Sequence, residues 1–186
     1  MNKLILGVLL WSFMHFIPAG MTGLRTKLTG LLGENGWKGV FALTMVAAIW
    51  LMVSGWKSTV PETLYLPPDW GRHACALLVL VGLVLFNAPY PPNNFKRLLR
   101  HPQLTGMACW GVGHLLANGD SRSLVLFGGL TAWAIVQILL INRRDGTWQK
   151  PAPAPRKNDV ILVLANLAIF AGLAFAHPWF TGVNLY

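Results

Sequence analysis

The chain has 186 residues, of which 54% are hydrophobic and only 11% are charged. Soluble domains carry about 25% charged residues, so this composition excludes an ordinary soluble protein and indicates an integral membrane protein. The net charge is +9, but the basic residues lie in short loops between apolar segments. That distribution favours contact with membrane lipids, anionic ones in particular, and argues against nucleic acid as a partner. We expect one domain over residues 1–186.

The hydrophobic pattern predicts an all-α membrane bundle of about six transmembrane helices, because a helix of about 20 apolar residues spans a bilayer. The first segment lacks a convincing A-x-A cleavage site, so we interpret it as an uncleaved helix and not as a signal peptide. In chain order the predicted spans are Lys3 to Gly20, Gly39 to Trp56, His73 to Pro89, Gln103 to Asn118, Ser123 to Asn142 and Asp159 to His177.

A short amphipathic helix is predicted between the first two spans, from Thr22 to Leu32. Four leucines fall on one face of this helix, and two basic residues, Arg25 and Lys27, fall on another. This spacing is typical of a helix that lies along the membrane interface with its apolar face in the lipid. The leucines are Leu24, Leu28, Leu31 and Leu32.

The basic residues predict the orientation of the chain. Six spans place both termini on one side, and 11 of the 15 basic residues fall in the three loops on the other side. Cytoplasmic loops are the ones enriched in Lys and Arg, so both termini are expected in the periplasm of a bacterial inner membrane. The 11 residues are Arg25, Lys27, Lys38, Lys96, Arg97, Arg100, Arg143, Arg144, Lys150, Arg156 and Lys157.

Two of the five histidines are predicted to lie deep in the membrane. His15 follows Lys3 by 12 residues, which places it roughly 18 Å from the outer face. His114 follows Gln103 by 11 residues, which places it roughly 17 Å from the inner face. In a core of about 30 Å both are near the middle, so the two side chains could meet at one level. His73, His101 and His177 fall at span ends.

An ionisable residue at such depth indicates a functional site. Two neutral imidazoles that face each other from separate helices suit haem iron, one on each axial face. Zinc or copper would need further ligands, and only Cys109 is close to this depth. The alternative is that both histidines are neutral structural residues, each hydrogen-bonded to a backbone carbonyl or a hydroxyl group.

The chain resembles the NnrU family of bacterial membrane proteins over nearly its whole length. The matching features are His15-Phe16-Ile17-Pro18, the segment from Gly33-Glu34 to Gly36, RHPQLTGMACWGVGHLLANGD at 100–120, and the terminal HPWFTG. The resemblance implies a link to nitrate, nitrite and nitric oxide metabolism in denitrifying bacteria.

The chain is similar also to the plant 15-cis-zeta-carotene isomerases, haem b enzymes of the same superfamily. This similarity implies that His15 and His114 bind the haem iron and that His101 lies near the site without binding the iron.

A weaker likeness to isoprenylcysteine methyltransferases rests on Arg100-His101-Pro102 and Gly106. The chain lacks the downstream Glu/Arg signature of those enzymes.

We therefore predict a membrane protein that binds haem b through His15 and His114 and has a redox or nitric oxide-linked role. Arg100, His101 and Arg122 are candidate partners for the haem propionates. The alternatives are a haem-dependent isomerase of a carotenoid-like polyene, a cofactor-free membrane assembly or transport factor, and a methyltransferase. Whether the protein is an enzyme, and whether its ligand is a small gas or an apolar polyene, stays open at this point.

Overall fold

The computed structural model describes residues 1–183 and 185, so positions 184 and 186 of the predicted domain lie outside the described residues. As predicted, the regular secondary structure of the described residues is helical, and their extended segments pair only at an isolated antiparallel bridge between Thr63 and Asp120. The helices are α1 (Asn2–Gly20), α2 (Thr22–Ser58), α3 (Gly71–Asn87), α4 (Phe95–Leu98), α5 (Pro102–Ala117), α6 (Ser121–Ser123), the π-helical turn η1 (Leu124–Gly128), α7 (Gly129–Asp145) and α8 (Arg156–Thr181).

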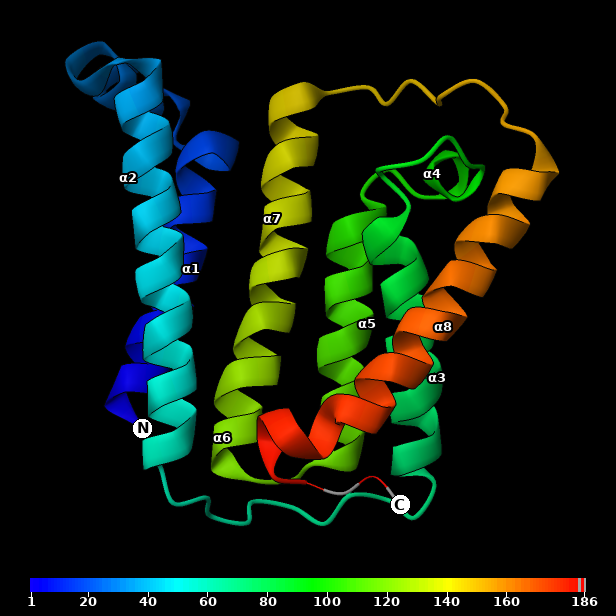
Figure 1. Cartoon of the computed structure of the whole chain (residues 1–186). Helices are drawn as coiled ribbons and strands as arrows, with labels where there is room; N and C mark the ends of the chain where they lie inside the picture. The colour runs from blue at the N-terminus through cyan, green and yellow to red at the C-terminus, as the bar shows by residue number, and fades with distance from the viewer. Residues whose placement is uncertain (184, 186) are drawn as a thin grey trace.

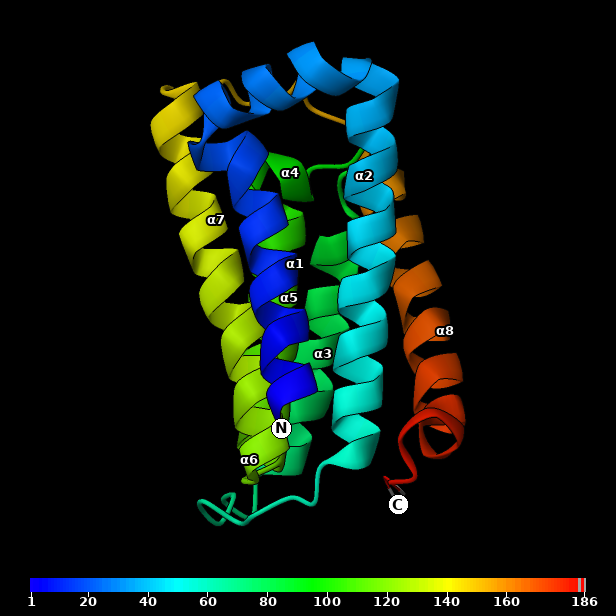
Figure 2. The ribbon, with the colours of Figure 1, turned by 90° about the vertical axis from the view of Figure 1, so that its left-hand side faces the viewer.

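The long helices alternate in direction along the chain (Figure 1). One end of the bundle, which we call the terminal end, holds both termini and the segment 59–70. The opposite end, which we call the basic end, holds the first part of α2, the segment 88–101 and the segment 146–155 (Figures 1 and 2). The three loops that carry most of the basic residues therefore share one end of the bundle, as the sequence predicts.

Four helical segments are long and apolar enough to cross a membrane: Asn2–Gly20, Thr22–Ser58, Ser121–Asp145 and Arg156–Trp179. Two further helices coincide with predicted spans but are short. α3 is apolar with 17 residues, and α5 has 16 residues, or about 24 Å of helix. The count of six spans therefore stays a prediction, although all six predicted segments are helical.

α2 consists of two helical parts that meet at Gly33. The backbone of Gly33 has φ 70° and ψ 165°, which is a conformation that only glycine adopts without strain. The first part, which includes Thr22 to Leu32, lies across the basic end, and the second part runs down beside α1 (Figure 2). The predicted amphipathic helix is thus present. Leu28 packs against the cluster of Met14, Ile17 and Trp37. Leu24, Leu31 and Leu32 are exposed, as lipid contact would require.

Close approaches through glycine hold the helix pairs together. α1 packs on α2, α3 packs on α5, α7 contacts both α1 and α5, and α8 packs on α3. A Cβ atom added at Gly82 of α3 would lie 2.8 Å from the carbonyl oxygen of Gly106 in α5, so these two helices meet backbone to backbone. Small residues allow such contacts between membrane helices, where dispersion forces replace the hydrophobic effect. This packing sets the position of α5 and of His114.

Candidate functional site

His15 lies on α1 inside a shell of aromatic rings. The centroid of its ring is 4.5 Å from that of Trp11, 4.9 Å from that of Trp133 and 5.3 Å from that of Phe41. These rings come from α1, α7 and α2. The Nδ1 atom of His15 lies 2.8 Å from the carbonyl oxygen of Trp11, one helical turn earlier. When Nδ1 carries the proton and donates to this carbonyl, Nε2 keeps its lone pair for a ligand.

His114 lies on α5 and repeats this arrangement. Its Nδ1 atom is 2.8 Å from the carbonyl oxygen of Trp110, again one turn earlier. Its ring stacks on Phe127 of η1, with centroids 4.4 Å apart and planes inclined by 20°. The ring of Trp110 lies 4.9 Å away. Metal-binding histidines usually donate their other ring N–H to such an acceptor, which sets the orientation of the ring.

The two histidines do not lie at one backbone level, contrary to the depth argument. Gln137 Nε2 donates to the carbonyl of His15, whereas Gly111, one turn before His114, lies against the carbonyl of Phe127. Gln137 and Phe127 mark the levels of His15 and His114. They are ten residues apart on the continuous helix formed by η1 and α7, which is roughly 15 Å. The reason is the placement of the helix ends: His114 is three residues from the end of α5, and His15 is five residues from the opposite end of the bundle.

The side chains of the two histidines nevertheless lean toward each other. α1 and α5 run in opposite directions (Figure 1), and a helical side chain leans toward the N-terminus of its own helix. The bonds to Trp11 and Trp110 show this lean directly, because each acceptor lies one turn toward that N-terminus. The rings of His15 and His114 are therefore closer in level than their backbones are.

Several buried polar atoms near His15 have no hydrogen-bond partner among the described residues. They include the indole nitrogens of Trp11 and Trp133, both of which flank the His15 ring, and the side-chain oxygen of Gln137, whose amide nitrogen donates to the carbonyl of His15. A buried donor without a partner costs about 1–3 kcal/mol. These atoms therefore mark a place between α1 and α7 where a bound group with polar substituents would find partners.

The other predicted site residues, Arg100, His101 and Arg122, lie at the two ends of the bundle. At the basic end, Arg100 donates to the carbonyl of Gly146 at 2.6 Å, and His101 Nε2 lies 2.9 Å from Asn142 Oδ1. Both contacts tie the start of α5 to the end of α7. The structure does not bring Arg100 and His101 together with His114, because the length of α5 separates them.

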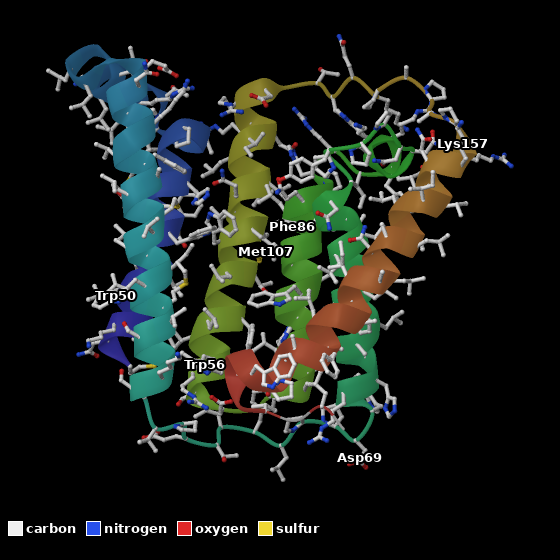
Figure 3. The ribbon with its side chains drawn as sticks, in the orientation of Figure 1. Trp50, Trp56, Asp69, Phe86, Met107 and Lys157 are labelled. Atoms are coloured by element: carbon white, nitrogen blue, oxygen red, sulfur yellow. The ribbon has the colours of Figure 1, made fainter. Side chains whose placement is uncertain are left out.

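Arg122 lies at the terminal end, where it joins α6 to α2. Its guanidinium group stacks over the ring of Trp56, 4.6 Å from the centroid, and donates to the carbonyl of Trp56 at 3.2 Å. Figure 3 shows Trp56 at the terminal end of α2. Trp56 also packs edge-on against Phe127, the ring on which His114 stacks. Arg122 is therefore the predicted cation closest in the fold to His114.

The turn after α5 is closed by side-chain caps. The carboxylate of Asp120 accepts from the backbone N–H groups of Arg122 and Ser123 at 2.9 and 3.1 Å and from the Ser123 hydroxyl at 2.6 Å. Burial alone would raise the pKa of Asp120, but these bonds and the Arg122 charge hold it below its ordinary value. Asn118 donates to the carbonyl of His114 at 2.9 Å. Asn118 thus caps the end of α5, and Asp120 caps the start of α6.

The sequence contains a further signal for this site. Each deep histidine follows a tryptophan by four residues: Trp11 precedes His15, and Trp110 precedes His114. In a helix this spacing places each indole on the same face as the histidine ring.

Among models of known protein families, the one described as NnrU protein matches residues 3–185, which is nearly the whole chain. No curated protein and no solved structure matches it. The expected similarity to the 15-cis-zeta-carotene isomerases therefore stays a prediction.

Proposed function

The chain belongs to the NnrU family of membrane proteins, and from this premise we propose that it binds one haem b through His15 and His114. One observation carries the proposal. Both histidines use Nδ1 to bond the carbonyl of a tryptophan one turn earlier, at the same distance of 2.8 Å, and both therefore present Nε2. Two neutral imidazoles held in this way are a typical ligand pair for haem iron.

The surroundings of both histidines suit a flat apolar macrocycle. The His15 ring has Trp11, Trp133 and Phe41 as neighbours, and the partnerless indole N–H groups supply donors in an apolar setting. Arg122 at the terminal end is the best placed partner for a propionate, because Trp56 and Phe127 connect it to His114. Arg100 and His101 are the corresponding candidates at the basic end.

When bound, haem supplies one-electron chemistry and a site for small gases. The residues of this chain orient the imidazoles, exclude water with aromatic rings and hold the propionates. We propose that this serves nitrogen-oxide metabolism in denitrifying bacteria, as a redox protein or a nitric oxide-responsive protein. A haem-dependent isomerase of an apolar polyene is the alternative enzymatic role. A cofactor-free membrane assembly or transport factor is the alternative in which the histidines only join helices.

The visible absorption spectrum of the detergent-purified protein tests the haem proposal. We expect a low-spin spectrum with a Soret band that shifts and sharpens on reduction. His15→Ala and His114→Ala should each abolish haem binding or give a high-spin, five-coordinate form. His73→Ala is the matched control and should leave the spectrum unchanged, because His73 is exposed at the start of α3. A protein that stays colourless when haem is supplied would contradict the proposal and favour the cofactor-free role.

Exposure of the reduced protein to nitric oxide separates the roles within the haem proposal. A shift of the Soret band on addition of nitric oxide would support a gas-responsive role, and a shift on addition of a polyene would support isomerisation. A spectrum that changes only with the redox state would support electron transfer. None of these outcomes depends on the identity of a protein partner.

We also propose that both termini lie in the periplasm of a bacterial inner membrane. The support is the shared position of the basic loops at one end of the bundle, because such loops stay in the cytoplasm. Reporter fusions at Lys57 and at Arg144 should give opposite results, with Arg144 inside. A cytoplasmic C-terminus would contradict both the orientation and the number of spans.

A further inference from the structure

A groove of about 570 Å³ opens at the basic end between α4 and the start of α8. Its walls include Arg97 and Leu98 of α4 and Arg156, Asp159 and Val160 of α8. A second hollow of about 250 Å³ shares Asp159 and Val160 with it and continues along α8. The groove lies far along the molecule from His114, in a region that the proposed haem site does not use.

The charged side chains give the groove a positive balance. Arg97 uses its Nε to donate to the carbonyl of Pro151 at 3.0 Å, which leaves the terminal nitrogens of the guanidinium group for other acceptors. The guanidinium of Arg156 makes no hydrogen bond to the described residues. Two arginines thus line a space that holds one carboxylate, so the groove suits an anion.

That carboxylate already has partners. Asp159 accepts from the backbone N–H and from the side-chain amide of Asn94, both at 2.7 Å. The side-chain amide nitrogen of Asn94 donates to the carbonyl of Ala154 at 2.8 Å, and its side-chain oxygen accepts from the backbone N–H of Ala154 at 3.0 Å. This network joins α4, the segment before α8 and α8 itself without using either arginine. Asp159 therefore builds the wall of the groove with neutral donors as its hydrogen-bond partners, and its charge offsets only one of the two arginines.

The hollow along α8 is apolar and faces outward. Val160 is 57% exposed and Leu164 is 58% exposed, and Val163 lies between them in the lining. α8 is one of the helices long and apolar enough to cross a membrane, so this face meets acyl chains. The cations lie at the end of that helix, where a headgroup would be. A ligand for both hollows needs an anionic group at one end and an apolar chain along α8. A phospholipid has this form.

We propose that the groove between α4 and α8 binds the phosphate of an anionic phospholipid through Arg97 and Arg156, with an acyl chain along Val160, Val163 and Leu164. The proposal does not depend on haem. Arginine suits this task because its planar guanidinium group bonds phosphate oxygens in pairs. Since α8 packs mainly on α3, a lipid in this groove would add a second anchor at its other side.

Native mass spectrometry of the full chain in detergent tests the proposal. The probes are phosphatidylglycerol and phosphatidylcholine with identical acyl chains, and inorganic phosphate as a competitor. We expect phosphatidylglycerol to bind and Arg156→Gln to weaken it about tenfold, as the loss of one charge-assisted bond implies. Arg97→Gln should act in the same direction. Lys157→Gln is the matched control, because Lys157 points away from the bundle (Figure 3), and it should change affinity less than about twofold.

Three results would overturn the proposal. If phosphatidylcholine binds as tightly as phosphatidylglycerol, the negative charge of the headgroup plays no part in binding. If inorganic phosphate competes at concentrations similar to those of the lipid, the groove is a site for small anions and not for a lipid. Unchanged binding of phosphatidylglycerol to Arg156→Gln would mean that the lipid binds elsewhere. This variant is expected to fold normally, because the Arg156 side chain makes no hydrogen bond to the described residues. Leu164→Ser should weaken phosphatidylglycerol without affecting phosphate, which separates the chain contact from the headgroup contact.

Discussion

His15 and His114 share one local arrangement and differ in nearly everything around it. Both lie four residues after a tryptophan, and in each case the helix brings the carbonyl of that tryptophan within reach of the histidine Nδ1. His15 is enclosed by rings from α1, α2 and α7. His114 stacks on Phe127 of η1, has the ring of Trp110 beside it and lies near the terminal end.

The difference lies in what holds each histidine in place. The surroundings of His15 are packed side chains, with Trp133 buried between the helices. The region around His114 also depends on hydrogen bonds from the segment 59–70, because the hydroxyl of Tyr65 donates to the carbonyls of Leu115 and Asn118. We infer that packing governs the first site, whereas the second needs the cap and the connecting segment at the terminal end as well.

The largest expected effect on stability comes from placing a side chain at Gly111, where α5 and α7 are in close contact. A Cβ there would lie 2.8 Å from the carbonyl of Phe127 and still closer to Thr131. Gly111→Leu should push α5 from α7 and lower the free energy of unfolding by about 3 kcal/mol. In a thermal scan this corresponds to roughly 6–12 °C for a chain of this size. Gly172→Leu is the control, because no atom lies within 4 Å of a Cβ added there. Equal melting of both variants would contradict the close α5–α7 contact.

Replacing the aromatic rings beside the two histidines should have the next largest effect on stability. It also compares the His15 and His114 sites directly. Trp133 is 6% exposed and contacts both Trp11 and His15, whereas Phe127 is 6% exposed and contacts His114, Trp110 and Trp56. Each change to leucine should cost about 2 kcal/mol through lost contacts and a cavity. Trp133→Leu should disturb His15 alone, and Phe127→Leu should disturb His114 alone. The NMR signals of the two imidazoles in each variant distinguish the sites, and a variant that moves both would mean that they are coupled.

The cap at Asp120 gives a smaller effect. Asp120→Ala removes the acceptor for two N–H groups and should cost about 1 kcal/mol in an unfolding measurement at pH 7. Asp69→Ala is the control, because Asp69 lies in the exposed segment before α3 (Figure 3).

The effect of Asp120 depends on pH in a known direction. Because the folded protein holds the pKa of Asp120 below its ordinary value of 3.8, the carboxylate stabilises the fold above that pH. The stabilisation is lost as the pH falls through the lowered pKa. The difference between wild type and Asp120→Ala should therefore be full at pH 7 and should vanish in strong acid. A difference that grows toward low pH would contradict the cap.

The smallest effect concerns Tyr65. Burial, and then the charge of Asp120, raises the pKa of Tyr65, so its neutral form is favoured in the folded state. Its contribution is present below pH 10 and is lost as the pH rises through the raised pKa. Tyr65→Phe should cost about 0.5–1 kcal/mol below pH 10, since one hydroxyl loses its carbonyl acceptors. Tyr90→Phe is the control, because Tyr90 is 72% exposed. Equal changes in the two variants would mean that the segment 59–70 does not support α5.

Much of the architecture was predictable because it depends on residues close in sequence. Each predicted span coincides with a helix, the helix from Thr22 to Leu32 forms, and Asp120 caps the turn after α5. Hydrophobic runs, glycine and proline positions and capping residues act within one or two helical turns. The family, too, was recognisable from motifs that are continuous in the sequence.

The relative placement of the helices was not predictable. Counting residues from each span end suggested one level for His15 and His114, but the contacts of Gln137 and Gly111 place their backbones on different levels along α7. The groove between α4 and α8 has the same origin.

The sequence by itself thus determined the class, the helices, the basic end and the two Trp–His pairs. Only the tertiary structure decided which rings surround each histidine, how far apart in level the two lie and where two arginines meet an apolar face. The physical reason is that periodicity specifies which side of a helix is apolar, but not how far the helix slides along its neighbour. That distance depends on close contacts such as Gly82 with Gly106, which are made between residues far apart in the chain.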